Sequence, residues 1–373
     1  MRIVHIVTLV SDDGAFGGPT SVAIGQLEEL AARGHDVELL SLWRGTSTSP
    51  QRIGTVPLRA RPARALIPGQ GFLGLMHPLL ARDMWRALDG VDVVHIHASR
   101  DLVSLTALAA AALRRRPFLV QTHGMVQPRH TTAAKVFDQV YVPLLRRARR
   151  CLVLTDEESR GLAEVTGTRG PLRLHLPNGV RTRSMTGERR GKDVLYLARL
   201  HPVKRPGAFV EMAALVHRQL PDVRFTMFGP DEGSLPTVLK LIADHGLEDV
   251  VSYRGALVHA AAVDAYKSAA VYVLPSAAEV FPMTVVEALA MGTPVVCTDG
   301  CGIAKELAHR GAAMVTDGSP EAMADAVRGI LGDDALSRSL VEAGRLAVEE
   351  VFSIGAVGDR LEEIYRDVKH VAT

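Results

Sequence analysis

The chain has 373 residues, of which 47% are hydrophobic and 23% charged, and its formal net charge is +2. This length favours two domains, because one domain usually takes about 100 to 200 residues. The small net charge does not favour nucleic-acid binding. The longest apolar stretch, Leu102 to Leu113, is shorter than the roughly 20 residues of a membrane span. The apolar start, Arg2 to Val10, is too short for a secretion signal and predicts a first strand.

Charge and cysteine content favour a cytoplasmic protein with a basic first half. Residues 1–180 hold 22 Lys and Arg against 15 Asp and Glu (net +7), and the rest hold 21 against 26 (net −5). The three cysteines give an odd count without paired metal-ligand spacing, which favours a reducing compartment. Cys297 and Cys301 are compatible with a redox or metal site, but without further ligands nearby we expect buried thiols.

A strand, a helix and a strand are predicted at the start of the chain. After the first strand come a glycine-rich loop from Gly14 to Thr20, a helix from Ser21 to Arg33 and a strand from His35 to Leu42. Glycines at such a junction let the backbone approach a phosphate or sugar closely, although a tight turn would need them equally. Residues 47–78, with five prolines, predict a long loop that contributes to an acceptor surface.

The glycine-rich loop also suits a dinucleotide-dependent sugar epimerase or dehydratase. That fingerprint requires an acidic residue at the end of the second strand. Trp43 and Arg44 stand there instead, although an arginine would suit a 2′-phosphate. Tyr365 and Lys369 have the Tyr-x3-Lys spacing, but they lie at the C-terminus on a helix with a polar face, and we interpret the match as coincidence.

Histidines follow the next two predicted strands, Val91 to Ile96 and Pro117 to Gln121. We expect His95 and His97 to point to opposite faces of the sheet, with His97 at the strand's end in a ligand site. His123 comes directly after the second of these strands. Open parallel sheets bind ligands beyond the carboxyl ends of their strands, so His123 is well placed to meet one.

Arginines cluster at 114–116 and 146–150. A solvated face is the simpler interpretation. The alternative is peripheral contact with an anionic membrane surface, to which each basic residue contributes roughly 1 kcal/mol.

The second half predicts an alternation of strands and helices. We interpret Arg181 to Lys192 as a linker, and the strand Val194 to Leu197 then leads to Arg199 and Lys204, two cations that can converge on one diphosphate. The other predicted elements are helices at 207–219, 235–245, 305–308, 320–331 and 335–350, strands at 224–229, 250–253 and 313–316, and a final helix opened by Phe352 and Ser353.

Residues 271–299 predict a strand, a loop, a helix and a second strand. The helix N-terminus offers backbone N–H groups to an anion. Glu279 in the loop and Glu287 on the helix can accept hydrogen bonds from hydroxyls, so the stretch suits a nucleotide sugar. A solvated helix with a glutamate near its N-terminus explains the same pattern.

Glu279-x7-Glu287, within LPSAAEVFPMTVVEALAMGTPVV, resembles the signature of the retaining glycosyltransferases of family 4. The resemblance implies the α/β GT-B fold, two Rossmann-like domains whose parallel sheets face each other across a cleft. Residues 1–178 with about 353–373 would form the acceptor side, and 179–352 would bind the nucleotide sugar. The donor would be a UDP-sugar or a GDP-sugar, and the acceptor a saccharide, a lipid-linked molecule or a small molecule.

The resemblance also implies roles for individual residues. Because the sequence has no Asp-x-Asp motif and fixed cations can take the place of a metal, we expect neither a metal nor another cofactor. Catalytic roles fall on His123, Arg199, Lys204 and Glu279; donor binding on Gly17, Gly18, Arg254, Leu257, Phe281, Pro282, Met283, Thr284 and Glu287; and the acceptor side on His97 and Lys135. The chain departs from the family pattern at Val280 and Pro282, where glycine is common, and at Arg181, where aspartate is usual. A non-catalytic protein that binds nucleotide sugars is the alternative on the same scaffold.

Overall fold

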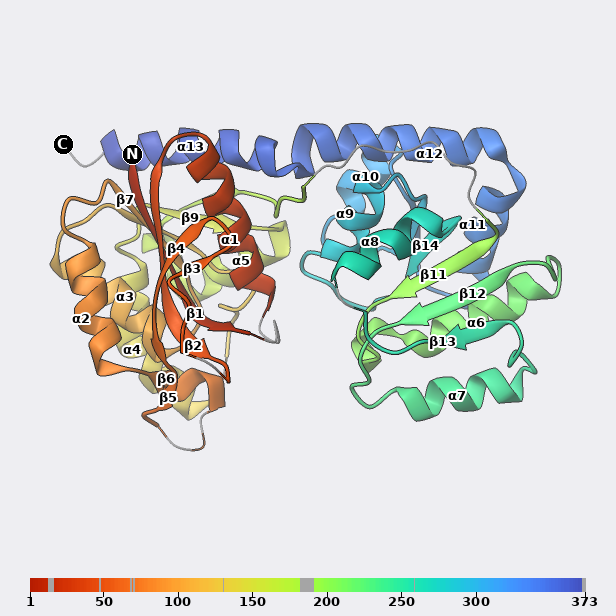
Figure 1. Cartoon of the computed structure of the whole chain (residues 1–373), viewed down its shortest axis with the longest axis horizontal. Helices are drawn as coiled ribbons and strands as arrows, with labels where there is room; N and C mark the ends of the chain where they lie inside the picture. The colour runs from red at the N-terminus through yellow and green to blue at the C-terminus, as the bar shows by residue number, and fades with distance from the viewer. Residues whose placement is uncertain are drawn as a thin grey trace. The chain divides into compact units, whose positions relative to one another are not determined.

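The computed structural model describes residues 1–12, 17–46, 48–67, 69, 71–129, 131–181, 191–257 and 259–370. The chain divides into two compact units (Figure 1): unit 1 is Met1–Gly179 with Ile354–Thr373, and unit 2 is Val180–Ser353. The start of the glycine-rich loop, including Gly14, and most of the predicted linker, at 182–190, lie outside the described residues.

Unit 1 is built on an eight-stranded sheet in the order β10-β9-β8-β7-β1-β2-β4-β3. All neighbouring strands in it are parallel except β3 and β4. The strands are β1 (Arg2–Ser11), β2 (Asp36–Arg44), β3 (Arg52–Ile53), β4 (Val56–Pro62), β7 (Val93–His97), β8 (Phe118–Gln121), β9 (Arg150–Val153) and β10 (Leu172–His175), with β5 (Arg64–Ala65) and β6 (Leu75–Met76) paired separately. The helices are α1 (Gly17–Ala32), α2 (Pro78–Ala87), α3 (Leu102–Leu113), α4 (Thr132–Leu145), α5 (Asp156–Thr166) and α13 (Ile354–His370).

Two hydrophobic cores lie on the two faces of this sheet. On β1, Val4 and Ile6 pack in the core that includes α2 and α3, whereas Ile3 and Val7 pack in the core that includes α1 and α13. This alternation follows from the two-residue period of a strand. His5 has the same parity as Ile3 and Val7, and it therefore faces α13.

One segment predicted for unit 1 is wrong. Residues 47–78 are not one long loop, because β4 pairs in parallel with β2 and extends the main sheet. The prolines Pro57 and Pro62 fit because they lie near the two ends of a strand close to the sheet edge. Tyr365 lies on the final helix, as predicted, and is completely buried on α13, whose apolar residues complete one core of unit 1.

Unit 2 is built on a six-stranded parallel sheet in the order β13-β12-β11-β14-β15-β16. In chain order this is 3-2-1-4-5-6, the strand order of the Rossmann fold. The strands are β11 (Asp193–Leu197), β12 (Arg224–Phe228), β13 (Val251–Tyr253), β14 (Val271–Leu274), β15 (Val295–Thr298) and β16 (Met314–Thr316). The helices are α6 (Pro206–His217), α7 (Leu235–Asp244), α8 (His259–Ser268), α9 (Met283–Ala290), α10 (Ala304–Arg310), α11 (Pro320–Gly332) and α12 (Asp334–Ala347).

The prediction of two Rossmann-like α/β domains is confirmed, and a cleft between facing sheets stays a prediction. In unit 2 the predicted elements lie within a few residues of the observed ones, except that α8 was not predicted and α12 ends at Ala347 in a π-helical turn, Val348–Phe352. The three cysteines, Cys151, Cys297 and Cys301, are free and buried.

Candidate functional site

The polar residues predicted in the second half lie on loops at the carboxyl edge of the unit 2 sheet. Lys204 follows β11, Glu279 follows β14 and Gly300 follows β15, and these strands are neighbours. Their loops are joined by backbone hydrogen bonds, in which Ala277 donates to the Val203 carbonyl (2.8 Å) and Glu279 donates to the Gly300 carbonyl (3.0 Å). The strand order reverses between β11 and β14, which is where open α/β sheets bind ligands.

Lys204 and Glu279 form an ion pair at this reversal point. The Lys204 Nζ atom contacts the Glu279 Oε2 atom, and the two side chains are 15% and 17% exposed. Because both charges are largely withdrawn from water, each depends on the other for stabilisation. A ligand that engages Lys204 must therefore supply negative charge, and one that engages Glu279 must supply hydrogen-bond donors.

Arg199 also follows β11, but it has a different partner. Its Nη1 atom donates to both carboxylate oxygens of Glu232, at 2.9 and 2.7 Å, and Glu232 follows β12. The Arg199 side chain is 57% exposed, so this ion pair contributes little stability and exchanges readily for another anion. The convergence of Arg199 and Lys204 on one diphosphate stays a prediction, because each cation here pairs with its own carboxylate.

The N-terminus of α9 opens at the same edge. Pro282 is the N-cap rather than the first helical residue, and it makes no side-chain hydrogen bond to the helix. The N–H groups of Met283 and Thr284 lie in the first turn, where backbone N–H groups have no helical acceptor and suit an anion. Phe281 is buried against Phe352, with ring centroids 6.0 Å apart, and this contact anchors the loop before the helix.

Two buried tyrosines orient polar side chains of α9. The Tyr266 hydroxyl donates to the Glu287 Oε2 atom (3.2 Å), and the Tyr272 hydroxyl lies 2.8 Å from the Thr284 Oγ1 atom. Burial raises the pKa of both tyrosines, so they stay protonated. Sequence reasoning missed them, because Tyr272 reads as an ordinary strand residue and Tyr266 lies on the unpredicted helix α8.

Gly229, which the sequence analysis also did not identify, joins two loops at the edge of the site. Its φ is 145°, and a Cβ atom would lie 1.9 Å from the Ala198 carbonyl oxygen, so no other residue fits without moving the backbone. The Gly229 N–H donates to the Gly255 carbonyl (2.8 Å). This bond ties the segment after β13, with exposed Arg254 and partly buried Leu257, to the loop after β12. The Gly-Pro pair directly after a strand was the available signal.

In unit 1, His123 lies in a strained turn directly after β8. Its φ is +50° and that of Gly124 is +74°, and the Met125 N–H donates to the Thr122 carbonyl (2.8 Å). A positive φ is uncommon for a residue with a side chain, and such strain concentrates at functional sites.

Glu158, on α5, holds this turn in place. Its Oε1 atom accepts hydrogen bonds from the Thr122 hydroxyl and the Gly124 N–H, both at 2.5 Å, and its Oε2 atom accepts one from the Leu154 N–H (2.6 Å). The residue is 1% exposed. The sequence around it, TDEES, reads as an acidic helix start, and nothing in it distinguishes Glu158 from its exposed neighbours.

Glu158→Gln is expected to destabilise unit 1 by about 2 kcal/mol, because the amide nitrogen must face a backbone N–H and leaves it unpaired. Trp43 and Trp85 are the chain's two tryptophans and both belong to unit 1, so urea unfolding followed by tryptophan fluorescence measures this unit alone. The control is Glu157→Gln, an exposed neighbour that should change little. Equal stability of the two variants would contradict the role assigned to Glu158.

The structure corrects the placement of His97. His95 and His97 do not point to opposite faces: their rings stack with centroids 4.4 Å apart, because residues two apart on a strand share one face. His97 is 2% exposed, so it reaches a ligand only through His123, to which it is hydrogen-bonded (2.8 Å). Lys135, in contrast, is exposed on α4.

Gly17 and Gly18 form the first turn of α1, which begins four residues before the predicted Ser21. Nothing lies within 4 Å of a Cβ atom placed on Gly18. Their position after β1 keeps them at the carboxyl edge of the unit 1 sheet.

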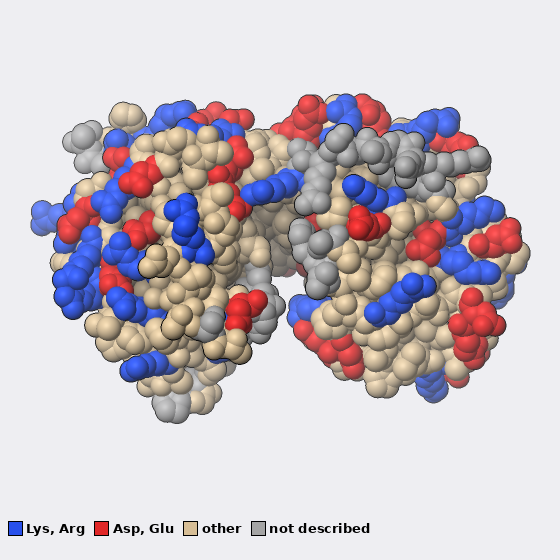
Figure 2. Space-filling model, viewed as in Figure 1, with Lys and Arg blue, Asp and Glu red and all other residues tan. Residues whose placement is uncertain are grey.

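Several arginines of the two clusters form ion pairs and hydrogen bonds with other residues of unit 1. Arg150 pairs with Asp367 of α13 at 2.5 Å, Arg114 pairs with Asp89, and Arg149 donates to the Val368 carbonyl (2.9 Å). On the face shown in Figure 2, Lys and Arg of this unit are interspersed with Asp and Glu. No helix among the described residues is long and apolar enough to span a bilayer. The contacts favour a structural role for these arginines, and membrane contact stays a prediction.

Two family models match the chain, one after the other. Residues 16–184 match the model described as "Glycosyltransferase Family 4", and residues 184–347 match "Glycosyl transferases group 1". The chain is 33% identical over 180 residues to D-inositol 3-phosphate glycosyltransferase from Paenarthrobacter aurescens, an alignment that spans 47% of this chain and 43% of that protein. It is 27% identical over 377 residues to phosphatidyl-myo-inositol mannosyltransferase from Mycobacterium leprae, spanning 94% and 93%.

Solved structures share the fold over nearly the whole chain. The structure of HepE from Anabaena in complex with UDP matches with a TM-score of 0.77 and 16% identity, covering 98% of this chain and 100% of that one. The pneumococcal O-GlcNAc transferase GtfA in complex with UDP and GlcNAc matches with a TM-score of 0.73 and 12% identity, covering 99% of each chain.

Proposed function

This chain belongs to glycosyltransferase family 4, and we propose that it transfers a hexose from a UDP-sugar to an acceptor hydroxyl with retention of the anomeric configuration. The observation that carries the proposal is the Lys204–Glu279 ion pair at the strand reversal of unit 2, in which Glu279 lies on the loop that leads into the N-terminus of α9. A cation and free N–H groups suit a diphosphate, and a carboxylate suits sugar hydroxyls. The UDP bound in similar structures supports this base.

When the donor binds, Lys204 and Glu279 separate, and each takes a part of the donor as its new partner. Lys204 leaves Glu279 for the donor diphosphate, and Glu279 accepts hydrogen bonds from the sugar, so neither charge stays unpaired. Arg199 leaves Glu232 for the same diphosphate at low cost, because its ion pair is exposed. Glu287, oriented by Tyr266, accepts from the ribose hydroxyls.

Catalysis follows from charge stabilisation. As the bond between the sugar and the diphosphate stretches, negative charge grows on the leaving phosphate. Lys204, Arg199 and the N–H groups of Met283 and Thr284 stabilise it, and one such group is typically worth about 3 to 4 kcal/mol. The acceptor hydroxyl attacks from the leaving group's side and passes its proton to the departing diphosphate, so no protein nucleophile and no metal are needed. His123 orients the sugar.

The remaining predicted residues keep their roles as part of the proposal. Gly17 and Gly18 approach the donor through their backbone, and Lys135 lies on the acceptor side. Arg254, Leu257, Phe281 and Pro282 of unit 2 also contact the base and the diphosphate.

The acceptor is proposed as a polyol or sugar hydroxyl. Relatives act on acceptors named D-inositol 3-phosphate and phosphatidyl-myo-inositol, and another transfers a kanosaminyl group. These names support an acceptor panel of inositol phosphates and a phosphatidylinositol, and an amino-sugar nucleotide among the donors. The dinucleotide alternative loses its support, because the family match from residue 16 to 184 runs through the end of the glycine-rich loop.

The test incubates the chain with UDP- and GDP-sugars, with and without the acceptor panel, and follows nucleotide release and the anomeric signal of the product by NMR. We expect UDP release that the right acceptor accelerates, and a product with the donor's anomeric configuration. An inverted product would contradict retention, and donor binding without any release would favour the non-catalytic alternative.

Glu287→Ala is expected to raise the KM for the donor by about 10- to 100-fold while kcat changes less. Hydrogen bonds to a charged group are worth about 1.5 to 3 kcal/mol, and the ribose is bound equally in the ground and transition states. Steady-state kinetics checks this, with exposed Glu248→Ala as the control. An unchanged KM would remove Glu287 from the ribose site.

A further inference from the structure

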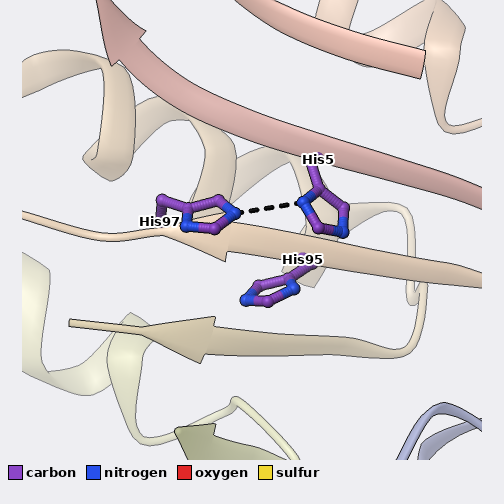
Figure 3. A group of neighbouring side chains, drawn as sticks. All are labelled: His5, His95 and His97. Atoms are coloured by element: carbon purple, nitrogen blue, oxygen red, sulfur yellow. Dashed lines mark hydrogen bonds between the residues drawn. The ribbon is translucent and has the colours of Figure 1, made fainter. Parts of the chain in front are cut away.

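Four histidines and one tyrosine form a continuous hydrogen-bond chain inside unit 1. Figure 3 shows three of the rings, His5 from β1 and His95 and His97 from β7, with a bond between His97 and His5. At one end, the His97 Nδ1 atom lies 2.8 Å from the His123 Nε2 atom. At the other end, the Tyr365 hydroxyl lies 2.8 Å from the His5 Nε2 atom and 2.7 Å from the His95 Nδ1 atom. We call this series the histidine chain.

The rings of the histidine chain are neutral. Burial lowers the pKa of His5, His95 and His97 well below the ordinary value, and neighbouring histidines lower it further. Burial lowers the pKa of His123 to about 3. A neutral imidazole has one N–H donor and one acceptor nitrogen, so it can continue such a series in only one direction at a time.

This rule couples the proton positions along the chain. If the Tyr365 hydroxyl donates to His5, then His5 donates to His97, His97 donates to the His123 Nε2 atom, and His123 carries its proton on Nδ1. If Tyr365 donates to His95 instead, every bond reverses and the His123 proton moves to Nε2. His97 is hydrogen-bonded to the Nε2 atom of His123, so the Nδ1 atom is the ring nitrogen of His123 that does not contact His97.

The spacing of His5, His95 and His97 also suits a metal ion, since their nearest ring nitrogens lie within 4.8 Å of one another. However, both nitrogens of His5 and both of His97 already take part in the histidine chain. Each of these neutral rings already uses its one nitrogen lone pair to accept a hydrogen bond. A metal ion could therefore bind only if a hydrogen bond of the histidine chain were broken. The hydrogen-bond chain is the arrangement that these atoms satisfy.

We propose that Tyr365 is a positioning residue: through His5 and His97 it fixes which nitrogen of His123 carries the proton, and thereby whether His123 donates to or accepts from the donor sugar. The functional part rests on the role proposed for His123, whereas the effect on the proton position does not. Tyr365 on the C-terminal helix α13 thus controls the hydrogen-bonding character of His123, which lies 242 residues earlier in the sequence (365 minus 123).

The test is Tyr365→Phe, with Tyr141→Phe as the matched control. Tyr141 is also completely buried in unit 1, and its hydroxyl has no hydrogen-bond partner among the described residues. With ¹⁵N-labelled histidine, ring nitrogen shifts in NMR separate the two neutral tautomers. We expect a single tautomer of His123 in the unaltered chain and in Tyr141→Phe, and a mixture in Tyr365→Phe. The same tautomer for His123 in all three proteins would overturn the proposal.

A second variant guards against misfolding of the first. His5→Phe interrupts the series at another point and is expected to give the same mixture, with tryptophan fluorescence confirming that unit 1 is folded. Kinetics then tests the functional part: kcat/KM for the donor should fall about twofold or more, in step with the competent fraction of His123, while UDP affinity stays unchanged. A chain that turns over no donor but shows the tautomer change refutes the proposed function and leaves the positioning role standing.

Discussion

Replacing Lys204 with alanine is expected to lower kcat for the donor by about 10²- to 10³-fold, the largest effect of any single substitution in the site. One pre-placed group that stabilises developing charge is typically worth about 3 to 4 kcal/mol. Lys204 is better buried than Arg199, the other cation proposed to bind the diphosphate, at 15% side-chain exposure against 57%. The substitution also leaves Glu279 without its cation. The Glu279 carboxylate then repels an incoming diphosphate. Single-turnover kinetics with saturating donor measures the effect on the chemical step.

The comparison variants separate charge from packing. Lys204→Arg keeps the charge and should retain more activity than the alanine variant, and Arg199→Ala should lose less than Lys204→Ala. Lys240→Ala, an exposed lysine on α7, serves as the control and should leave turnover unchanged. If Lys204→Ala turns over donor at the original rate, the diphosphate does not bind at Lys204 and the proposed chemistry fails.

Unit 1 is expected to unfold sharply on mild acidification, between about pH 6 and pH 4. The pKa values of His5, His95, His97 and His123 are lowered in the folded chain. In the unfolded chain these rings have a pKa near 6.5, so below that value the unfolded state binds more protons and stability falls with pH. Each such proton costs about 1.4 kcal/mol per pH unit, or about 5.6 kcal/mol per pH unit for the four, and His77, whose pKa burial also lowers, adds to this slope. Asp101, whose pKa burial raises, opposes this by at most one proton.

Urea unfolding at several pH values, followed by tryptophan fluorescence, measures this slope for unit 1. His95→Gln removes one of these rings and should reduce the slope by at most about a quarter, whereas exposed His245→Gln on unit 2 should not change it. A unit 1 stability that is flat from pH 7 to pH 5 would mean that these histidines are charged or hydrated when folded. Far-UV circular dichroism reports both units, so a transition seen there but not by fluorescence belongs to unit 2 and provides an internal reference.

The sequence alone determined much of unit 2, because its signals are local. A β-branched run, a proline-containing helix start and two glutamates eight residues apart predict the strand, loop and helix around Glu279 and Glu287, and the observed β14 and α9 agree with them. The alternation of strands and helices could be predicted for the same reason, whereas the two Rossmann-like domains were implied by the resemblance to the family 4 glycosyltransferases. A period of two or 3.6 residues is visible in one sequence.

Only the tertiary structure decided which groups pair with which. Lys204 and Glu279 are 75 residues apart and His5 and Tyr365 are 360 apart, and no periodicity links such positions. The strand order brings the first pair to one edge of a sheet, and the packing of α13 on unit 1 brings the second pair into contact. Partners chosen by three-dimensional packing, rather than by chain spacing, set the charge balance of the site and the proton positions of the histidine chain.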